Sequence, residues 1–192
     1  MRTGTPVFAD ARPAIFAVAT LLLAYISRAS LLRPKSHGFF RFFTWEAILG
    51  LVLMNAPLWF TDPFSWHQII SWILLVGSFA PLALGVHALQ THGRQSASAR
   101  QEPELFAFER TSRLVSEGIF HYIRHPLYSS LLLLAWGVFF KAPSVVGGGL
   151  AGMATAGLMR TALMDEAECL QVFGQEYREY MTHTRRFIPR VF

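Results

Sequence analysis

Five apolar segments constrain the fold of this chain more than any other feature. They cover residues 13–32, 44–60, 66–89, 126–141 and 145–159. A helix crosses the hydrocarbon core of a bilayer with about 20 apolar residues. The last two segments are shorter than this, so we expect them to form a tilted hairpin or to thin the bilayer locally. The pattern predicts an all-α, multi-pass integral membrane protein with about five transmembrane helices.

The composition fits a single small membrane domain over residues 1–192. With 53% hydrophobic residues and a mean hydropathy of +0.35, the chain is too apolar for an ordinary soluble domain. The net charge of +5 is spread between the apolar segments, so we expect no nucleic-acid partner. A single cysteine, Cys169, excludes an intramolecular disulfide, and we interpret it as an apolar filler. Pro57 and Pro81 fall inside the second and third segments, which transmembrane helices tolerate.

The basic residues predict the orientation in the membrane. Loops on the inside of a membrane carry an excess of Lys and Arg. With five spans and an outside N-terminus, all 17 basic residues except Arg2, Arg12 and Lys141 lie on the inside. The polar stretch 90–124 and the charged C-terminal segment then share the cytosolic side.

A charged pentad opens the fourth segment, with the sequence Arg124-His125-Pro126-Leu127-Tyr128. Proline suits the first position of a helix, so we predict that a helix begins at Pro126 and that His125 lies just outside it in extended geometry. The N–H groups of Leu127, Tyr128 and Ser129 would then be free and would attract an anion. The alternative is that Arg124 and His125 only anchor a transmembrane helix at the headgroup level.

Three acids lie where the last apolar segment meets the interface, namely Asp165, Glu166 and Glu168. Burying carboxylates at this depth costs free energy unless they interact with a positive group. The acids could pair with arginines of the chain, or they could lie on a solvated helix face. The third alternative is that they bind a cationic ligand, held between them and the helix that begins at Pro126. Such a site would receive a positive group at one end and an anionic group at the other.

Two further patterns give predictions about packing and metals. Gly148, Gly152 and Ala156 repeat every four residues and predict a face on which another helix approaches closely. The histidines other than His125 show no metal-ligand spacing, so we expect them to be interfacial or structural and expect no metal site.

An ordered set of motifs resembles the isoprenylcysteine carboxyl methyltransferase family and its phospholipid methyltransferase relatives. The set comprises Leu114-Val115-x-x-Gly118-x-Phe120, the pentad, the acidic pair, Phe173-Gly174-x-x-Tyr177-x-x-Tyr180 and Ile188-Pro189. The resemblance implies a membrane enzyme that binds S-adenosyl-L-methionine on the cytosolic side and methylates a lipophilic acceptor. Residues 1–89 would supply three transmembrane helices, and residues 90–192 the catalytic part, closed by a C-terminal helix. No glycine-rich dinucleotide fingerprint is present in the sequence.

The resemblance also implies which residues form the site. Those that would bind the cofactor are Ser112, Arg113, Leu114, Val115, Phe120, His125, Pro126, Leu127, Tyr128, and Asp165 or Glu166. Those that would act in catalysis are Arg124, His125, Glu166 and Arg160. The family commonly has Tyr at the position of Phe120, and its prenylcysteine enzyme has Arg at the position of Thr161. Arg160 is the nearest basic residue here, rotated by about 100° on a helix.

The acceptor and the reaction class have alternatives. An isoprenylcysteine carboxylate is slightly favoured by the resemblance, whereas a phospholipid or another small lipophilic amine or thiol fits an acidic pocket better. An amine acceptor would need a base, for which Glu166, Glu168 and His125 are candidates. A membrane reductase of steroid-reductase type would use NADPH, with Arg110 and Arg113 near its phosphate. A non-catalytic membrane scaffold is the remaining alternative.

Overall fold

The computed structural model describes residues 11–34, 36–93, 111 and 113–189. Within these residues the regular structure is helical, apart from one isolated bridge between Ile123 and Arg185. The elements are α1 (Ala11–Ile26), α2 (Arg28–Leu31), α3 (His37–Asn55), η2 (Ala56–Leu58), α4 (Trp66–His92), η4 (Gly118–His121), α5 (Pro126–Phe139) and α6 (Val145–His183). The all-α prediction is therefore confirmed.

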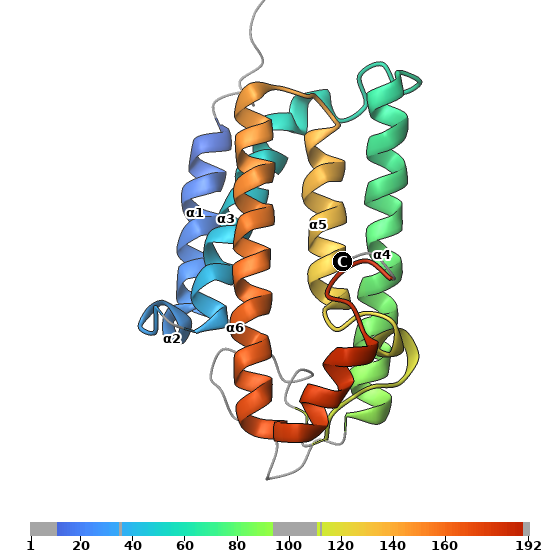
Figure 1. Ribbon diagram of the computed structural model, residues 1–192. Coiled ribbons are helices and arrows are strands. Elements are labelled where there is room, and N and C mark those ends of the chain that lie inside the picture. The colour runs from blue at the N-terminus through green and yellow to red at the C-terminus, as the bar shows by residue number, and fades with distance from the viewer. Residues whose placement is uncertain (1–10, 35, 94–110, 112, 190–192) are drawn as a thin grey trace, which may run out of the picture.

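The long helices form a bundle in which successive helices run in alternating directions (Figure 1). α4 packs on α5, α3 packs on α6, and α1 lies on the outside of α3. The main apolar core lies between α3, α4, α5 and α6 and contains the fully buried residues Leu51, Ala135, Val138 and Ala151. Because of the alternation, the end of α4, the start of α5 and the second half of α6 meet at one end of the bundle.

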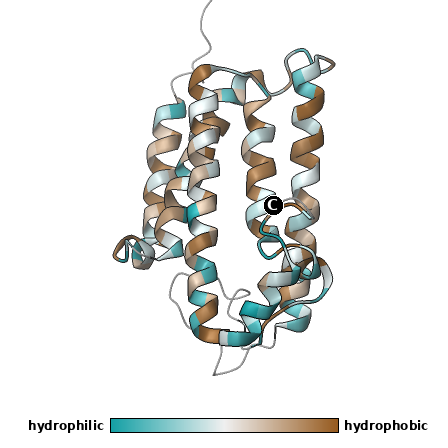
Figure 2. Cartoon of the chain, viewed as in Figure 1, coloured by the Kyte–Doolittle hydropathy of each residue, from teal (hydrophilic) through white to brown (hydrophobic). Residues whose placement is uncertain are grey.

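Two helical stretches are long and apolar enough to cross a membrane. They are His37–Leu58 and Trp66–His92, with mean hydropathies of 1.3 and 2.1. α1 and α5 are apolar but shorter. α4 exposes Ile73, Val76 and Phe79, each about two-thirds accessible. Figure 2 shows apolar residues along the bundle and hydrophilic residues where α6 turns back at one end.

The helix boundaries differ from the apolar segments in several places. The segment 13–32 is divided between α1 and α2, and α3 differs from the segment 44–60 at both ends. α3 begins at His37, before the apolar run, because the hydroxyl of Ser36 accepts a hydrogen bond from the N–H of Phe39 and caps the helix. It ends at Asn55, and Pro57 lies in the short η2 turn that completes the helical stretch His37–Leu58. Pro81 does lie inside α4, as expected.

α6 continues from the last apolar segment through the charged residues as one element, Val145–His183. Gly174 interrupts it with φ 57° and ψ −124°, a backbone conformation that residues other than glycine rarely adopt. The helix folds back at this point, and its final part lies below α5 and next to the lower end of α4 (Figure 1). The C-terminal helix of the prediction is therefore the second half of α6.

The predicted stripe of small residues is on the wrong face of α6. Gly152 and Ala156 are exposed, and a Cβ added at Gly152 would meet no atom within 4 Å. The close approach occurs at Gly157, where an added Cβ would lie 2.3 Å from Oγ1 of Thr44 on α3. A spacing of four residues cannot show which side of a helix its neighbour occupies, and here the buried residues follow a mixed spacing of three and four.

Candidate functional site

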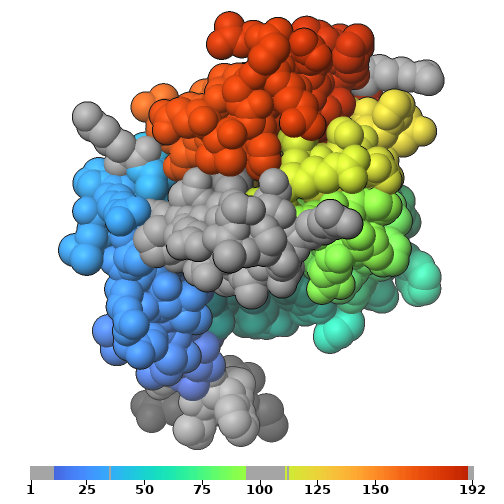
Figure 3. Space-filling model, turned by 90° about the horizontal axis from the view of Figure 1, so that it is seen from below, coloured from blue at the N-terminus to red at the C-terminus, as the bar shows by residue number. Residues whose placement is uncertain are grey.

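A cavity lies at the end of the bundle where α4 ends and α5 begins. It holds about 700 Å³ of empty space, including the part open to solvent. The described residues that line it are Leu89, Thr111, Leu114, Val115, Phe120, Arg124, His125, Pro126, Leu127, Tyr128, Asp165, Cys169, Phe173, Tyr177 and Tyr180. Figure 3 shows this end of the molecule, with the second half of α6 in red beside the segment before α5 in yellow.

The start of α5 forms one wall of the cavity. α5 begins at Pro126, as predicted, although His125 has φ −124° and ψ 61° and is not extended. α4 approaches this point closely, since a Cβ added at Gly85 would lie 3.1 Å from Cγ of Pro126. The N–H of Ser129 donates to the carbonyl of His125 at 2.9 Å, so the prediction that this N–H is free was wrong. A helix whose first position is Pro126 makes its first internal bond at Ser129.

Glu166 is the centre of a buried ionic network behind this wall. Its carboxylate accepts hydrogen bonds from Nε of Arg124 at 2.9 Å and from Nη2 of Arg186 at 3.0 Å. Oε1 also lies 3.3 Å from Nε2 of His125. Burial alone would raise the pKa of Glu166, but the hydrogen bonds from His125 and Arg186 and the charges of His125 and Arg124 outweigh it and lower the pKa to about 2. Glu166 is therefore ionised, and its carboxylate forms ion pairs with Arg124 and Arg186.

The residues after α6 are joined to the residues before α5. The N–H of Arg124 donates to the carbonyl of Arg185 at 2.7 Å, and the N–H of His125 donates to the carbonyl of Arg186 at 3.0 Å. The guanidinium of Arg124 also donates to the carbonyl of Thr184 at 2.6 Å. The hydroxyl of Ser129 donates to the carbonyl of Phe187 at 2.9 Å. These bonds fix the position of the pentad against the end of α6.

His125 stands between the two consecutive acids of α6. Its Nδ1 lies 3.6 Å from Oδ2 of Asp165, and its Nε2 faces Glu166. Its ring stacks on Tyr128 with the planes 13° apart and the centroids 5.2 Å apart. The imidazole is 5% exposed, so its orientation is fixed by these contacts. Asp165 lines the cavity, whereas Glu166 does not.

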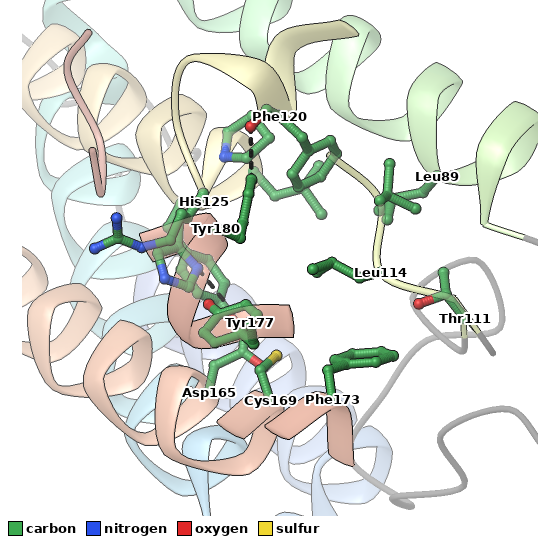
Figure 4. A pocket seen from close by; sticks show the side chains of 15 residues that line it. Leu89, Thr111, Leu114, Phe120, His125, Asp165, Cys169, Phe173, Tyr177 and Tyr180 are labelled. Carbon is green, nitrogen blue, oxygen red and sulfur yellow. Dashed lines mark hydrogen bonds and ion pairs between the residues drawn. The ribbon is translucent and has the colours of Figure 1, made fainter. Parts of the chain in front are cut away.

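Aromatic rings from the second half of α6 close the cavity. Phe173 lies just before the Gly174 kink, and Tyr177 and Tyr180 lie just after it. The Tyr180 hydroxyl donates to the carbonyl of Phe120 at 2.6 Å. Burial raises the pKa values of Tyr177 and Tyr180, so both phenols are neutral at physiological pH. In Figure 4 Asp165, His125 and the two tyrosines gather at one end, and Leu89 and Leu114 lie at the other.

Most of the predicted cofactor residues lie together around this cavity. Of the described ones, Leu114, Val115, Phe120, His125, Pro126, Leu127, Tyr128 and Asp165 line it, and so does the predicted catalytic Arg124. Ser112 lies outside the described residues.

Three described residues of the predicted cofactor and catalytic sets, Arg113, Arg160 and Glu166, do not line the cavity. Arg113 is exposed and lies 3.8 Å from Glu117. Arg160 is exposed too, with its guanidinium 5.5 Å from the centre of the Phe40 ring on α3. Thr161, beside it, is fully buried and donates to the carbonyl of Gly157. Glu166, which sequence reasoning offered as an alternative to Asp165 for the cofactor, lies behind the cavity in its arginine network.

Sequence reasoning missed several lining residues, namely Leu89, Thr111, Cys169, Phe173, Tyr177 and Tyr180. Cys169 was interpreted as an apolar filler, yet its buried thiol is part of the wall and lies 3.8 Å from Oδ1 of Asp165. A signal was present, because steps of four residues from Asp165 through Cys169 and Phe173 follow one helix face.

A second polar cluster lies where the start of α3 meets α6. Nδ1 of the fully buried His37 lies 2.6 Å from Oε2 of Glu168. The N–H of His37 donates to Oε1 of the same carboxylate at 3.3 Å. These contacts attach α3 to α6 beside Asp165. The spacing of histidines along the sequence does not show this contact, because 131 residues separate the two partners.

The chain has no match among protein-family models, curated proteins or solved structures. The resemblance to the isoprenylcysteine carboxyl methyltransferase family therefore rests on the quoted motifs alone, and it stays a prediction.

Proposed function

We propose that this protein is an integral membrane methyltransferase that binds S-adenosyl-L-methionine in the cavity and methylates a lipophilic acceptor. The observation that carries the proposal is the position of the Asp165 carboxylate, at the wall of a cavity lined by Phe120, Tyr128, Phe173, Tyr177 and Tyr180. Aromatic faces and a carboxylate together attract a cation that is weakly hydrated. A sulfonium is such a cation, and the apolar end of the cavity suits the rest of a partly aromatic ligand.

Several groups of the chain would hold and orient such a ligand. Asp165 would face the ligand's positive charge, and the neutral phenols of Tyr177 and Tyr180 would add dipoles without adding charge. Arg124 would act indirectly, because its guanidinium is engaged by Glu166 and Thr184 and fixes the wall. When bound, S-adenosyl-L-methionine supplies a methyl group on sulfur that an acceptor displaces in line. The protein's part is to align the acceptor and to exclude water.

A membrane location would favour a lipophilic acceptor. We propose that α1, α3, α4, α5 and the first half of α6 all cross the bilayer and that the cavity opens on the cytosolic side. The two helices of sufficient length and hydropathy support this, as do the exposed apolar residues of α4. In this arrangement membrane lipids surround the bundle, and the polar cluster around the cavity lies at the interface.

The chemistry of the acceptor has two candidates. The quoted motifs favour carboxyl methylation of an isoprenylcysteine, which needs a cation to orient the carboxylate. Among the described residues, Arg160 lies against Phe40, and Arg124 and Arg186 are engaged by Glu166. This observation favours a lipid amine, for which Asp165 and His125 are candidate polar partners among the lining residues.

Two measurements on the purified full chain test the proposal. Isothermal titration with S-adenosyl-L-methionine and with NADPH separates a methyltransferase from a reductase, and binding of NADPH alone would refute our assignment. Labelled cofactor is then supplied with a farnesylated cysteine or with phosphatidylethanolamine in vesicles. A base-labile product from the first supports a carboxyl methyl ester, and a base-stable product from the second supports an amine. Cofactor binding without transfer to any lipophilic acceptor would indicate a scaffold.

A further inference from the structure

The side chain of Lys141 is buried at the end of the bundle opposite the cavity, where α5 ends and α4 begins (Figure 1). Lys141 follows α5 and is 1% exposed, although lysine is almost never fully buried without a partner. Burial lowers the pKa of its ammonium, so the charged form needs contacts that compensate for the lost water. Among the described residues one side-chain oxygen accepts a hydrogen bond from Nζ, namely Oε1 of Gln68 at 2.9 Å.

Two tryptophan rings face the same ammonium. Nζ lies 3.5 Å from the centre of the Trp72 ring on α4 and 5.4 Å from the centre of the Trp59 ring, which follows η2. A cation within about 6 Å of a ring centre is attracted to the face of the ring, most strongly where water is excluded. Both rings also pack against the main apolar core. Trp59, Trp72 and Gln68 therefore surround Nζ, and we call these three residues the ammonium box.

The amide of Gln68 is oriented so that its oxygen faces the ammonium. Its Nε2 donates to the carbonyls of Thr61 at 3.0 Å, Leu58 at 3.1 Å and Lys141 at 3.3 Å. An amide turned by 180° would place its oxygen against these carbonyl oxygens and its NH₂ group against the ammonium. The Gln68 side chain is fully buried, so water does not supply an alternative partner. The acceptor of the box is therefore fixed by the backbone of the η2 segment and of Lys141.

The position of Lys141 after α5 also favours a positive charge. The last carbonyls of a helix lack internal partners and carry a partial negative charge. Side chains of neighbouring helices donate to two of them, Ser71 to the carbonyl of Gly137 at 2.7 Å and Asn55 to that of Val138 at 2.8 Å. A cation just beyond these carbonyls interacts favourably with the end of the helix. The ring faces, the amide oxygen and the helix end thus all stabilise the charged form of Lys141.

We propose that the ammonium box is a binding site for an alkylammonium group and that Lys141, in its charged form, is its internal ligand. The bound ammonium joins the segment after α3, the start of α4 and the end of α5, because the box takes residues from the first two and Lys141 follows the third. This inference concerns the end of the bundle opposite the cavity, and it does not rest on methyl transfer.

A double-mutant cycle on the full chain in detergent tests the contact. Lys141→Met keeps the length of the side chain and removes the charge, and it should lower the Tm by about 4–8 °C. Trp72→Leu should lower the Tm as well, and the loss in the double variant should be smaller than the sum of the two single losses. Trp66→Leu is the matched control, because Trp66 is also on α4 but is 66% exposed, and its effect should add to that of Lys141→Met. A wild-type Tm in Lys141→Met, or additive losses for Lys141 and Trp72, would overturn the proposal.

An added amine tests the chemical class of the ligand. Lys141→Ala removes three carbons and the nitrogen, which n-propylammonium supplies. This cation should raise the Tm of Lys141→Ala and leave the wild type unchanged, because only the variant has an empty box. 1-Propanol at the same concentration, in which a hydroxyl replaces the ammonium, is the matched control and should have no such effect. Equal effects of the amine and the alcohol on Lys141→Ala would contradict an ammonium site. If Lys141→Ala does not fold, the double-mutant cycle decides the question.

Discussion

Asp165 and Glu166 are consecutive residues of α6, yet their carboxylates have different surroundings. Glu166 is bound by Arg124 and Arg186 behind the cavity, whereas Asp165 lines the cavity. His125 lies between the two, 3.6 Å from Asp165 and 3.3 Å from Glu166. A ligand and the protein's own arginines therefore do not compete for one acid. Substitutions at the two positions should give different phenotypes.

Asp165→Asn should weaken binding of S-adenosyl-L-methionine while leaving the fold intact. Loss of one charge-assisted contact costs about 1.5–3 kcal/mol, which corresponds to about a 10–150-fold increase in Kd. Isothermal titration measures the change, and Glu176→Gln on the exposed face of α6 is the control. Equal affinity in Asp165→Asn and wild type would contradict our placement of the positive group.

Glu166→Gln should instead destabilise the protein. Arg124, whose side chain is 7% exposed, would lose its carboxylate partner, and breaking a buried ion pair costs about 3–5 kcal/mol. Arg186→Ala should cost less, because that side chain is 28% exposed. Chemical unfolding in detergent, followed by circular dichroism, compares the two variants. A smaller loss in Glu166→Gln than in Arg186→Ala would be inconsistent with the network.

The stability should fall in acid because of Glu166. Its pKa is lowered from 4.5 to about 2 in the folded protein, so its contribution is present above pH 4.5 and is lost as the pH falls towards 2. A shift of this size corresponds to about 3 kcal/mol. Unfolding midpoints measured across this range should decrease more steeply in the wild type than in Glu166→Gln. Parallel curves for the two proteins would rule out this role.

Gly174→Ala should disturb the closure of the cavity. Alanine is strained at φ 57° and ψ −124°, at a cost of about 1–3 kcal/mol. The position of Phe173, Tyr177 and Tyr180 depends on the kink, so the affinity for the cofactor should fall with the stability. Gly149→Ala lies in the regular part of α6, where an added Cβ meets no atom within 4 Å, and it should be neutral or slightly stabilising. A similar response of both variants would argue against the kink.

Gly157→Leu should separate α3 from α6, whereas Gly152→Leu should be tolerated. A Cβ at Gly157 would lie 2.3 Å from Oγ1 of Thr44, and overpacking of a close helix contact costs about 1–3 kcal/mol or more. Gly152 is exposed on the opposite side and has open space around it. Thermal unfolding of the two variants in detergent gives the comparison. A greater loss of thermal stability in Gly152→Leu would instead support the predicted packing face of Gly148, Gly152 and Ala156.

The sequence was informative wherever one residue dictates its own backbone. Pro126 begins α5, as predicted, because proline fits a first helical turn. The kink at Gly174 was not predicted, although glycine tolerates the positive φ found there. Hydropathy predicted the bundle helices for the same local reason. These features depend on few neighbours, so they can be recognised before the fold is known.

The partners of charged and small residues were much harder to predict. Nothing in the sequence says that Glu166 faces two arginines while Asp165 faces a cavity, because a rotation of one residue around α6 decides it. His37 and Glu168 meet only through the packing of α3 on α6. Arg160 was expected near the acceptor, but its position on the helix turns it towards Phe40.

The bonds between Arg124 and Thr184 also determine when the cavity can form during synthesis. They join residues 60 positions apart, and Ser129 is joined to Phe187 over 58 positions. Residues are added at about 5–20 per second, so seconds pass between the synthesis of Arg124 and that of its partners. During that interval α1, α3 and α4 have already been made, while the guanidinium of Arg124 still lacks the acceptors that follow it in the chain. A nascent chain paused before Glu166 would therefore hold the start of α5 without its ionic partner.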